Sequence, residues 1–501
     1  MSRLTKQERQ ERLADWRIGD IIYQVIVDRF AESKRLAQKL EHYAAPKTLK
    51  QWNELPTQPG YFHEEHISHG ELQFWGGDLE SLRARLDYIE GLGIKTLYLN
   101  PVFTAFSNHK YDTSDYTTVD PQYGTNEELR ALAEELHQRG MKLILDGVFN
   151  HVGRRSVLFQ RASENAGHPE EDFFTFDQSL PNGYLGWRNV KNLPELKLEN
   201  PAVRQMLFEG EQSIVCRYLK EEGIDGWRLD VGPDIGFEFL QALRDSAHSV
   251  RPDCTIIGEC WNYPEEWLQV LDGILNMHLR FLILSLLNGT LSPSMTGRLI
   301  ETMIEDSGIE GILRCHNVLE NHDTPRLTHE VPDDETRCLA RTMQFTLPGS
   351  PVIYYGGELG MQGGHDPGCR APMRWDLVND ENPDYTHTRQ LLSIHAENPA
   401  LRIGNFRLLA SEQVLAYLRK TDDPTESIIV LINPHSVEQN VMIAIRDSRL
   451  MDAAPLECLF TGTKINMLSG FLKTTVPAKQ AMIFRTADRR KNKGYSMFKR
   501  V

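Results

Sequence analysis

The stretch Gly226-Trp227-Arg228-Leu229-Asp230-Val231 decides the fold. Its apolar and aromatic residues are typical of a short buried strand, which an arginine and an aspartate interrupt. Side chains alternate between the two faces of a strand, so Arg228 and Asp230 are predicted to point the same way. Taken alone, the two charges could equally form a purely structural ion pair or belong to a functional site, because buried charges persist when they are matched.

Three further apolar runs end in acidic residues or histidines. They are residues 143–146, which lead to Asn150 and His151, residues 256–259, and residues 318–323. In a parallel α/β barrel, polar groups at the C-terminal ends of the strands form the active site. The four runs together therefore predict such a site.

Strand-like and helix-like runs alternate along most of the chain. We expect strands over residues 21–30, 96–101, 141–148, 226–231, 255–260, 273–279, 318–324 and 351–356. We expect helices over residues 79–92, 127–139, 201–221 and 236–249. Eight strands separated by helical stretches predict a (β/α)8 TIM barrel.

The alternation of strand-like and helix-like runs is absent from four segments, and these segments predict the domain organisation. Residues 1–16 are expected to form a charged N-terminal arm and residues 17–398 the catalytic barrel. The polar segment 152–200 is expected to be a small domain inserted after the third strand (domain B). Short alternating runs over 399–486 predict an antiparallel C-terminal β-sandwich (domain C), followed by a basic tail over 487–501.

Composition restricts the partners and the compartment. The 501 residues carry 55 Lys and Arg against 70 Asp and Glu, a net charge of −15, which argues against nucleic acid or an anionic membrane as a partner. No apolar run reaches the ~20 residues of a membrane span, and the N-terminus lacks an apolar signal region. Seven scattered cysteines without pairing or metal-ligand spacing predict reduced thiols in a cytoplasmic protein.

The motifs together resemble the α-amylase family of glycoside hydrolases (family 13) over about residues 17–486. The resemblance rests on residues 146–151 (Asp-Gly-Val-Phe-Asn-His), 226–231, 258–259 (Gly-Glu), 321–323 (Asn-His-Asp), 193–200 and 356–361. Residues 107–113 (Ser-Asn-His-Lys-Tyr-Asp-Thr) and 322–326 (His-Asp-Thr-Pro-Arg) are similar to the cyclomaltodextrinase, neopullulanase and maltogenic amylase subgroup. Many members of that subgroup carry a β-sandwich module before the barrel. We expect none here, because the first strand begins near Ile21.

The resemblance implies an O-glycosyl hydrolase (EC 3.2.1) that cleaves α-1,4 linkages of maltooligosaccharides and maltodextrins with retention. Cyclodextrins are further candidate substrates. Asp230 is implied as nucleophile, Glu259 as acid/base and Asp323 as the third carboxylate, and retention needs the first two about 5–5.5 Å apart. Arg228 would keep Asp230 ionised. Cys260 and Trp261 would surround Glu259 with apolar groups that favour its acidic form.

The same resemblance implies sugar-binding roles for further residues. His151 and His322 would donate hydrogen bonds to the sugar at the cleavage point, although each alone would fit a core histidine. Tyr111 would stack on that sugar, and His109 would share its subsite.

Asp366 and Arg370 would grip the same sugar, or else form a loop salt bridge. Asp146 is expected to have a supporting role, holding either Arg228 or the strand ends. Trp261 and Trp227 would line sugar subsites or fill the barrel rim, and the sequence leaves both open.

No cofactor is expected. Calcium stays an alternative, but the segment after Arg29 lacks the run of Asp and Asn oxygens that a calcium site uses. A transglucosidase and a disaccharide phosphorylase would share the three carboxylates. A non-catalytic binding or transporter-partner barrel is disfavoured because all three carboxylates are present. Chain-length preference, endo or exo action and oligomeric state stay open.

Overall fold

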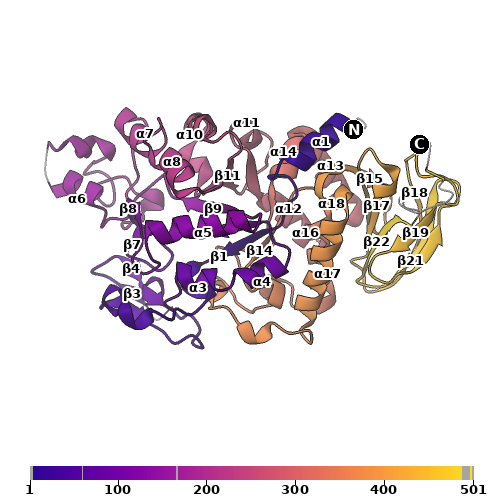
Figure 1. The fold of residues 1–501 in the computed structure, drawn as a ribbon, viewed down its shortest axis with the longest axis horizontal. Helices are drawn as coiled ribbons and strands as arrows, with labels where there is room; N and C mark the ends of the chain where they lie inside the picture. Colours follow the sequence, from indigo (N-terminus) through magenta and orange to yellow (C-terminus); the bar gives the residue numbers. More distant parts are fainter. Residues whose placement is uncertain (1–3, 59, 165–166, 488–496, 499–501) are drawn as a thin grey trace.

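The computed structural model describes residues 4–58, 60–164, 167–487 and 497–498, and its centre is a closed barrel of parallel strands (Figure 1). In order around the barrel the strands are β1 (Ile22–Val25), β6 (Thr96–Leu99), β9 (Lys142–Gly147), β10 (Gly226–Leu229), β11 (Thr255–Cys260), β12 (Gly273–Asn276), β13 (His316–Asn317) and β14 (Ser350–Tyr354). The strand β14 pairs with β1 and closes the ring. The predicted (β/α)8 barrel is confirmed.

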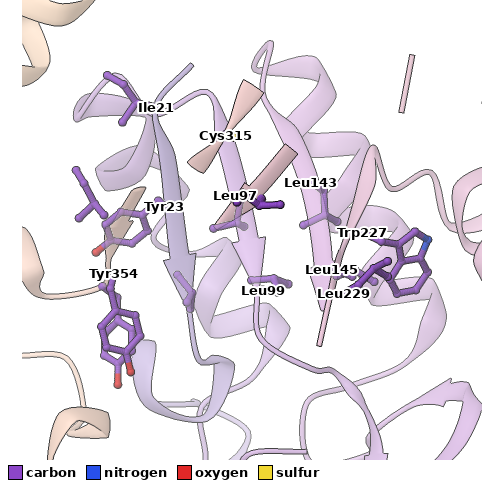
Figure 2. Close-up of a cluster of buried hydrophobic side chains, with 14 of the residues drawn as sticks. Ile21, Tyr23, Leu97, Leu99, Leu143, Leu145, Trp227, Leu229, Cys315 and Tyr354 are labelled. Atoms are coloured by element: carbon purple, nitrogen blue, oxygen red, sulfur yellow. The ribbon is translucent and has the colours of Figure 1, made fainter. Parts of the chain in front are cut away.

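The two faces of the barrel strands bury two different clusters. Tyr23, Leu97 and Leu143 belong to the large cluster between the strands and the surrounding helices, part of which Figure 2 shows. Side chains alternate along a strand, so their neighbours point into the barrel. That inner cluster contains Ile22, Tyr98, Ile144, Ile257, Leu275, Met277, Val318 and Val352.

Three strands depart most clearly from their predicted bounds. The strand β1 ends at Val25, and a helical turn, α2 (Val27–Phe30), follows where residues 21–30 were expected to be extended. The strand β12 ends at Asn276, whose side chain accepts a hydrogen bond from Leu279 N and caps helix α12 (Met277–Leu287). The prediction of a strand over 318–324 was wrong, since β13 covers only His316–Asn317.

A side chain explains why β13 is so short. Gln344, in helix α16 (Asp334–Thr346), donates from Nε2 to Asn317 O at 2.9 Å and to Val352 O at 2.7 Å. The amide of Gln344 thereby lies between β13 and β14 and takes a carbonyl that strand pairing would otherwise use. Beyond Asn317 the chain runs as a loop.

The helices predicted over 127–139 and 236–249 are present as α5 (Asn126–Gln138) and α10 (Phe237–Val250). The stretch 79–92 is divided into α3 (Leu79–Arg83) and α4 (Leu86–Gly91). The stretch 201–221 is divided into α7 (Pro201–Leu207), α8 (Ile214–Arg217) and the π-helix η6 (Tyr218–Glu222). Gly210, with φ +84°, lies in the connection between α7 and α8, where the chain leaves the helical conformation.

The long connection between β9 and β10 contains α6 (Val157–Glu164), η4 (Pro169–Phe173) and η5 (Trp187–Asn189). Aromatic rings hold it together, because Phe159 packs edge-on against Phe174 and Tyr184. A β-bridge between His151 and Glu195 ties the segment to the end of β9. Figure 1 shows α6 at the end of the molecule opposite the C-terminal sheets.

The C-terminal region forms two antiparallel sheets, as predicted. One has the strand order β15 (Asn405–Leu409), β16 (Leu415–Lys420), β17 (Ile428–Ile432), β22 (Ala481–Thr486), β19 (Pro455–Cys458) and β20 (Lys464–Asn466). The other pairs β18 (Gln439–Ala444) with β21 (Phe471–Val476). Leu418, Ile443 and Leu472 contribute to the cluster of side chains that the two sheets share. Most of the predicted basic tail lies outside the described residues.

The N-terminal arm begins with helix α1 (Lys6–Ala14), capped by Thr5. Arg12 is buried and reaches Ile403 O and Asn405 Oδ1, at the junction of the barrel and the C-terminal sheets. In the part of the chain that the structure describes, every helix is too short or too polar to span a bilayer.

Candidate active site

The polar residues of the site lie two positions beyond the apolar residues that fill the barrel. Asp146 follows Ile144 on β9, and Glu259 follows Ile257 on β11. Arg228 lies level with both strands, because its Cα is paired with Asp146 on one side and Ile257 on the other. The period of two along a strand thus places a charged layer on top of an apolar layer at the C-terminal end of the barrel.

Arg228 is the centre of this layer. Its guanidinium is fully buried and contacts three carboxylates: Asp146 at 2.7 Å, Asp230 at 3.0 Å and Glu259 at 2.8 Å. Asp230 and Glu259 are therefore held next to each other by one cation. As predicted, Arg228 and Asp230 point the same way, and Asp146 supports the arginine.

Burial decides the proton affinity of Asp230. Removal from water raises the pKa of Asp230 well above the ordinary aspartate value, and the positive charge of Arg228 acts in the opposite direction. The carboxylates of Glu259, Asp146 and Asp323 raise the pKa of Asp230 further. The expectation that Arg228 would keep Asp230 ionised is not supported by this balance, because burial outweighs the one cation and that cation serves several acids.

The surroundings of Glu259 are more polar than the sequence indicated. One carboxylate oxygen accepts a hydrogen bond from Val231 N at 3.1 Å, and the other accepts one from Trp261 Nε1 at 2.9 Å. The prediction that Cys260 and Trp261 would form an apolar environment was wrong for Trp261, which directs its N–H at the carboxylate. Trp261 as a whole is 52% exposed.

Asp323 completes the set of carboxylates from the loop after β13. His322 Nε2 lies 3.0 Å from Asp323 Oδ2, and Arg370 lies 3.3 Å from Oδ1. Arg370 also contacts Asp366 at 3.2 Å and donates to His322 O. The structure thus brings the predicted loop pair to the third carboxylate, and Asp323 is accessible, with 33% of its side chain exposed.

Tyr111 connects Asp146 on β9 with His322 in the loop after β13. Its hydroxyl donates to Asp146 Oδ2 at 2.8 Å and meets His322 Nε2, while its ring stacks on His322 with centroids 5.2 Å apart. His109 lies beside it, accepting from Tyr111 N and contacting Glu71. Burial, reinforced by the charge of Arg370, lowers the pKa of His322 well below its ordinary value, so the imidazole is neutral.

His151 lies at the edge of the same layer, where the inserted segment begins. It is buried, and burial lowers the pKa of His151 to about 4. Its Nε2 atom has no hydrogen-bond partner among the described residues. A neutral, buried imidazole with an unsatisfied nitrogen is suited to a hydroxyl of a bound ligand.

Two polar residues of the site were not predicted. Gln24 Nε2 contacts Asn100 Oδ1 and His322 Nδ1, both at 3.0 Å. The signal was present in the period of two, because Gln24 follows the inward-facing Ile22 and Asn100 follows the inward-facing Tyr98. By contrast, Trp227 is fully buried against aromatic rings, which resolves the choice left open for it in favour of core packing.

A calcium ion, which the family resemblance raised as an alternative, does not fit the acidic residues after β1. The carboxylate of Asp28 is paired with Arg29 at 2.8 Å, and that of Asp78 with Lys39 at 2.8 Å. Across the described ranges, no group of three or more His, Cys, Asp or Glu residues could hold a metal ion. Protein cations already neutralise these acids.

Residues 24–405 match the family described as alpha amylase, catalytic domain. Neopullulanase 2 of Thermoactinomyces vulgaris is 31% identical over 487 residues, which are 94% of this chain and 78% of the relative. A cyclomaltodextrinase of Geobacillus thermopakistaniensis is 33% identical over 433 residues, 84% of this chain and 69% of the relative.

Solved structures are similar over nearly the same range. The cyclic α-maltosyl-(1→6)-maltose hydrolase of Arthrobacter globiformis has a TM-score of 0.79 at 26% identity, covering 94% of this chain and 99% of that one. A debranching enzyme of Nostoc punctiforme has a TM-score of 0.76 at 29% identity, covering 94% and 99%. A barrel of this topology, with its acids in this order and a family match over most of its length, shows that the chain belongs to the α-amylase family of glycoside hydrolases.

Proposed function

We propose that the chain is a retaining hydrolase of α-1,4-linked glucosides, with maltooligosaccharides, maltodextrins and cyclodextrins as its substrate class. Asp230 is the nucleophile and Glu259 is the acid/base. The observation that carries the proposal is the contact of one buried guanidinium, that of Arg228, with both of these carboxylates. The names of the relatives support the substrate class.

The reaction proceeds in two displacements. An oxygen of Asp230 bonds to the anomeric carbon while the glycosidic C–O bond breaks, and the proton of Glu259 passes to the departing oxygen. Water then attacks the glucosyl-enzyme, Glu259 takes the proton of that water, and the bond to Asp230 breaks. The configuration is inverted twice and is therefore retained.

The charge of the site favours the transition state. Arg228 supplies one positive charge to the acids Asp146, Asp230 and Glu259, and Asp323 adds a further carboxylate at the rim. An oxocarbenium-like sugar carries positive charge at the anomeric carbon and would balance this excess of acids in a water-poor space. The bound substrate has no net charge, so the acids stabilise it less than they stabilise the transition state. Catalysis requires this difference in stabilisation.

The remaining residues are proposed to bind the sugar at the cleavage point. Tyr111, whose ring stacks on His322 and on His109, offers aromatic surface to the sugar, and His151 offers its unpaired Nε2. Asp323 and Arg370 provide an acceptor and a donor for sugar hydroxyls. An intracellular location is proposed because all seven cysteines are free and because a relative is named intracellular maltogenic amylase, from Bacillus subtilis.

The test follows the products of maltotriose, maltohexaose and β-cyclodextrin by proton NMR. We expect α-anomers to form first, and we expect Asp230→Asn and Glu259→Gln each to lower kcat by at least about 10³-fold. Wild-type turnover by Asp230→Asn would refute the mechanism. Products longer than the starting sugar would identify a transglucosidase, and turnover that depends on phosphate would identify a phosphorylase.

A further inference from the structure

The turn that follows Asp230 has a strained backbone. Val231 adopts φ 45° and ψ 50°, in the left-handed region that a β-branched residue rarely occupies. It is the N-cap of a short helical turn, α9 (Gly232–Ile235). A backbone of this kind is energetically unfavourable and persists only where neighbouring groups hold it.

This turn is in direct contact with the proposed acid/base. The amide of Val231 donates to Glu259 Oε2. The turn also packs on the end of β11, since a Cβ atom added to Gly232 would lie 3.2 Å from Glu259 O. A shift of the turn therefore changes both the hydrogen bond to the Glu259 carboxylate and the packing against its backbone.

Trp187, from the inserted segment, holds the far side of the turn. Its indole Nε1 donates to Asp234 Oδ2 at 3.0 Å, and Asp234 belongs to α9. Its ring stacks on His151, with centroids 5.6 Å apart and planes 29° apart. One half-buried indole thus touches both the strained turn and a residue of the proposed sugar site.

The segment around Trp187 is itself constrained. Arg188 and Asn189, the next two residues, have positive φ values of 48° and 62°. The amide of Trp187 donates to Leu193 O, and its carbonyl accepts from Val190 N. The indole therefore projects from a loop that backbone hydrogen bonds close.

We propose that Trp187 is a positioning residue for Glu259. Its hydrogen bond to Asp234 fixes the strained turn, and the turn, through Val231 N, acts with Arg228 and Trp261 to fix the Glu259 carboxylate. This inference rests on the proposed role of Glu259 as acid/base. Positioning matters because proton transfer to the departing oxygen requires hydrogen-bond distance, and a displacement of about 1 Å can cost about 10²-fold in rate.

The test compares two substrates in Trp187→Phe, a variant that keeps an aromatic ring for His151 and loses the N–H donor. Maltotriose needs Glu259 to protonate its leaving group. With α-maltosyl fluoride the leaving group is fluoride, which departs without a proton, and added azide attacks the glycosyl-enzyme without a general base. Together these two reagents complete a turnover that does not depend on Glu259.

We expect Trp187→Phe to lower kcat on maltotriose by about 10-fold with KM within about twofold, while turnover of the fluoride with azide stays within about twofold of wild type. Asp234→Ala removes the same bond from its other end, so it should show the same pattern. The double variant should be no worse than either single one, because the two changes remove one interaction.

Several outcomes would overturn the inference. They are an equal loss of turnover on both substrates, an unchanged kcat on maltotriose, or additive losses in the double variant. Trp52→Phe is the matched control, since Trp52 also loses an indole hydrogen bond, to Met373 O, away from the site. Glu259→Gln distinguishes a failure of the proposed function from a failure of the positioning role. If Glu259→Gln keeps wild-type turnover of maltotriose, the proposed function fails. If Glu259→Gln is inactive while Trp187→Phe turns over maltotriose normally, only the positioning role is rejected.

Discussion

At the scale of single residues, the burial of Asp230 leads to a prediction about pH. A nucleophile must be ionised, and burial raises the pKa of Asp230 above the ordinary aspartate value. Activity should therefore fall, as pH is lowered, at a higher pH than an exposed aspartate with a pKa of about 4 would give. The measurement is the pH profile of kcat/KM on maltotriose, and an acid limb at or below about pH 4 would contradict it.

The sequence predicted the residues of the site where they follow strand periodicity. Asp230 and Glu259 lie at the ends of apolar runs, so their position was readable. Gln24 could have been found by the same rule. Trp187 could not, because its partner Asp234 is 47 residues away in a different loop, and no local pattern encodes such a contact.

At the scale of elements, helix α1 connects the barrel to the C-terminal sheets. Arg12 donates to Ile403 O and Asn405 Oδ1, and it also pairs with Glu310. Arg12→Met removes the Arg12 donor from Ile403 O and Asn405 Oδ1, which should lower the free energy of unfolding by about 1–3 kcal/mol. Thermal unfolding measures this loss. Lys6→Met, on the exposed side of the same helix, is the control, and an equal effect of both variants would contradict the role of Arg12.

The type of each element, helix or strand, was predicted more reliably than its first and last residues. Hydrophobic runs identified seven of the eight barrel strands. The run 318–324 is a loop that follows β13, because the Gln344 side chain lies between β13 and β14. Helix breaks at Gly210 and between α3 and α4 were also missed. Periodicity reports which face is buried, whereas the end of an element depends on caps and on distant side chains.

At the scale of the whole molecule, the loops around β1 are joined by ion pairs inside the protein. Lys39 Nζ contacts Asp78 Oδ2 at 2.8 Å and Gln122 O at 2.9 Å, and Lys110 contacts Asp120 at 2.7 Å. Asp78 is almost fully buried, so its charge needs a partner. Lysine ammonium groups thus do what a bound cation would do for these acids.

We therefore predict that the stability of the protein does not depend on a divalent metal. Incubation with EDTA should leave the Tm unchanged, whereas Lys39→Met should lower it by several degrees. This variant removes the nearer cation from the buried Asp78 carboxylate and leaves only Arg35, 3.7 Å away, and breaking a buried ion pair costs up to about 3–5 kcal/mol. Exposed Lys34→Met is the matched control and should behave as wild type. A fall in the Tm of the wild-type protein with EDTA, reversed by added calcium, would contradict the prediction. It would mean that a cation outside these lysine pairs holds the fold together.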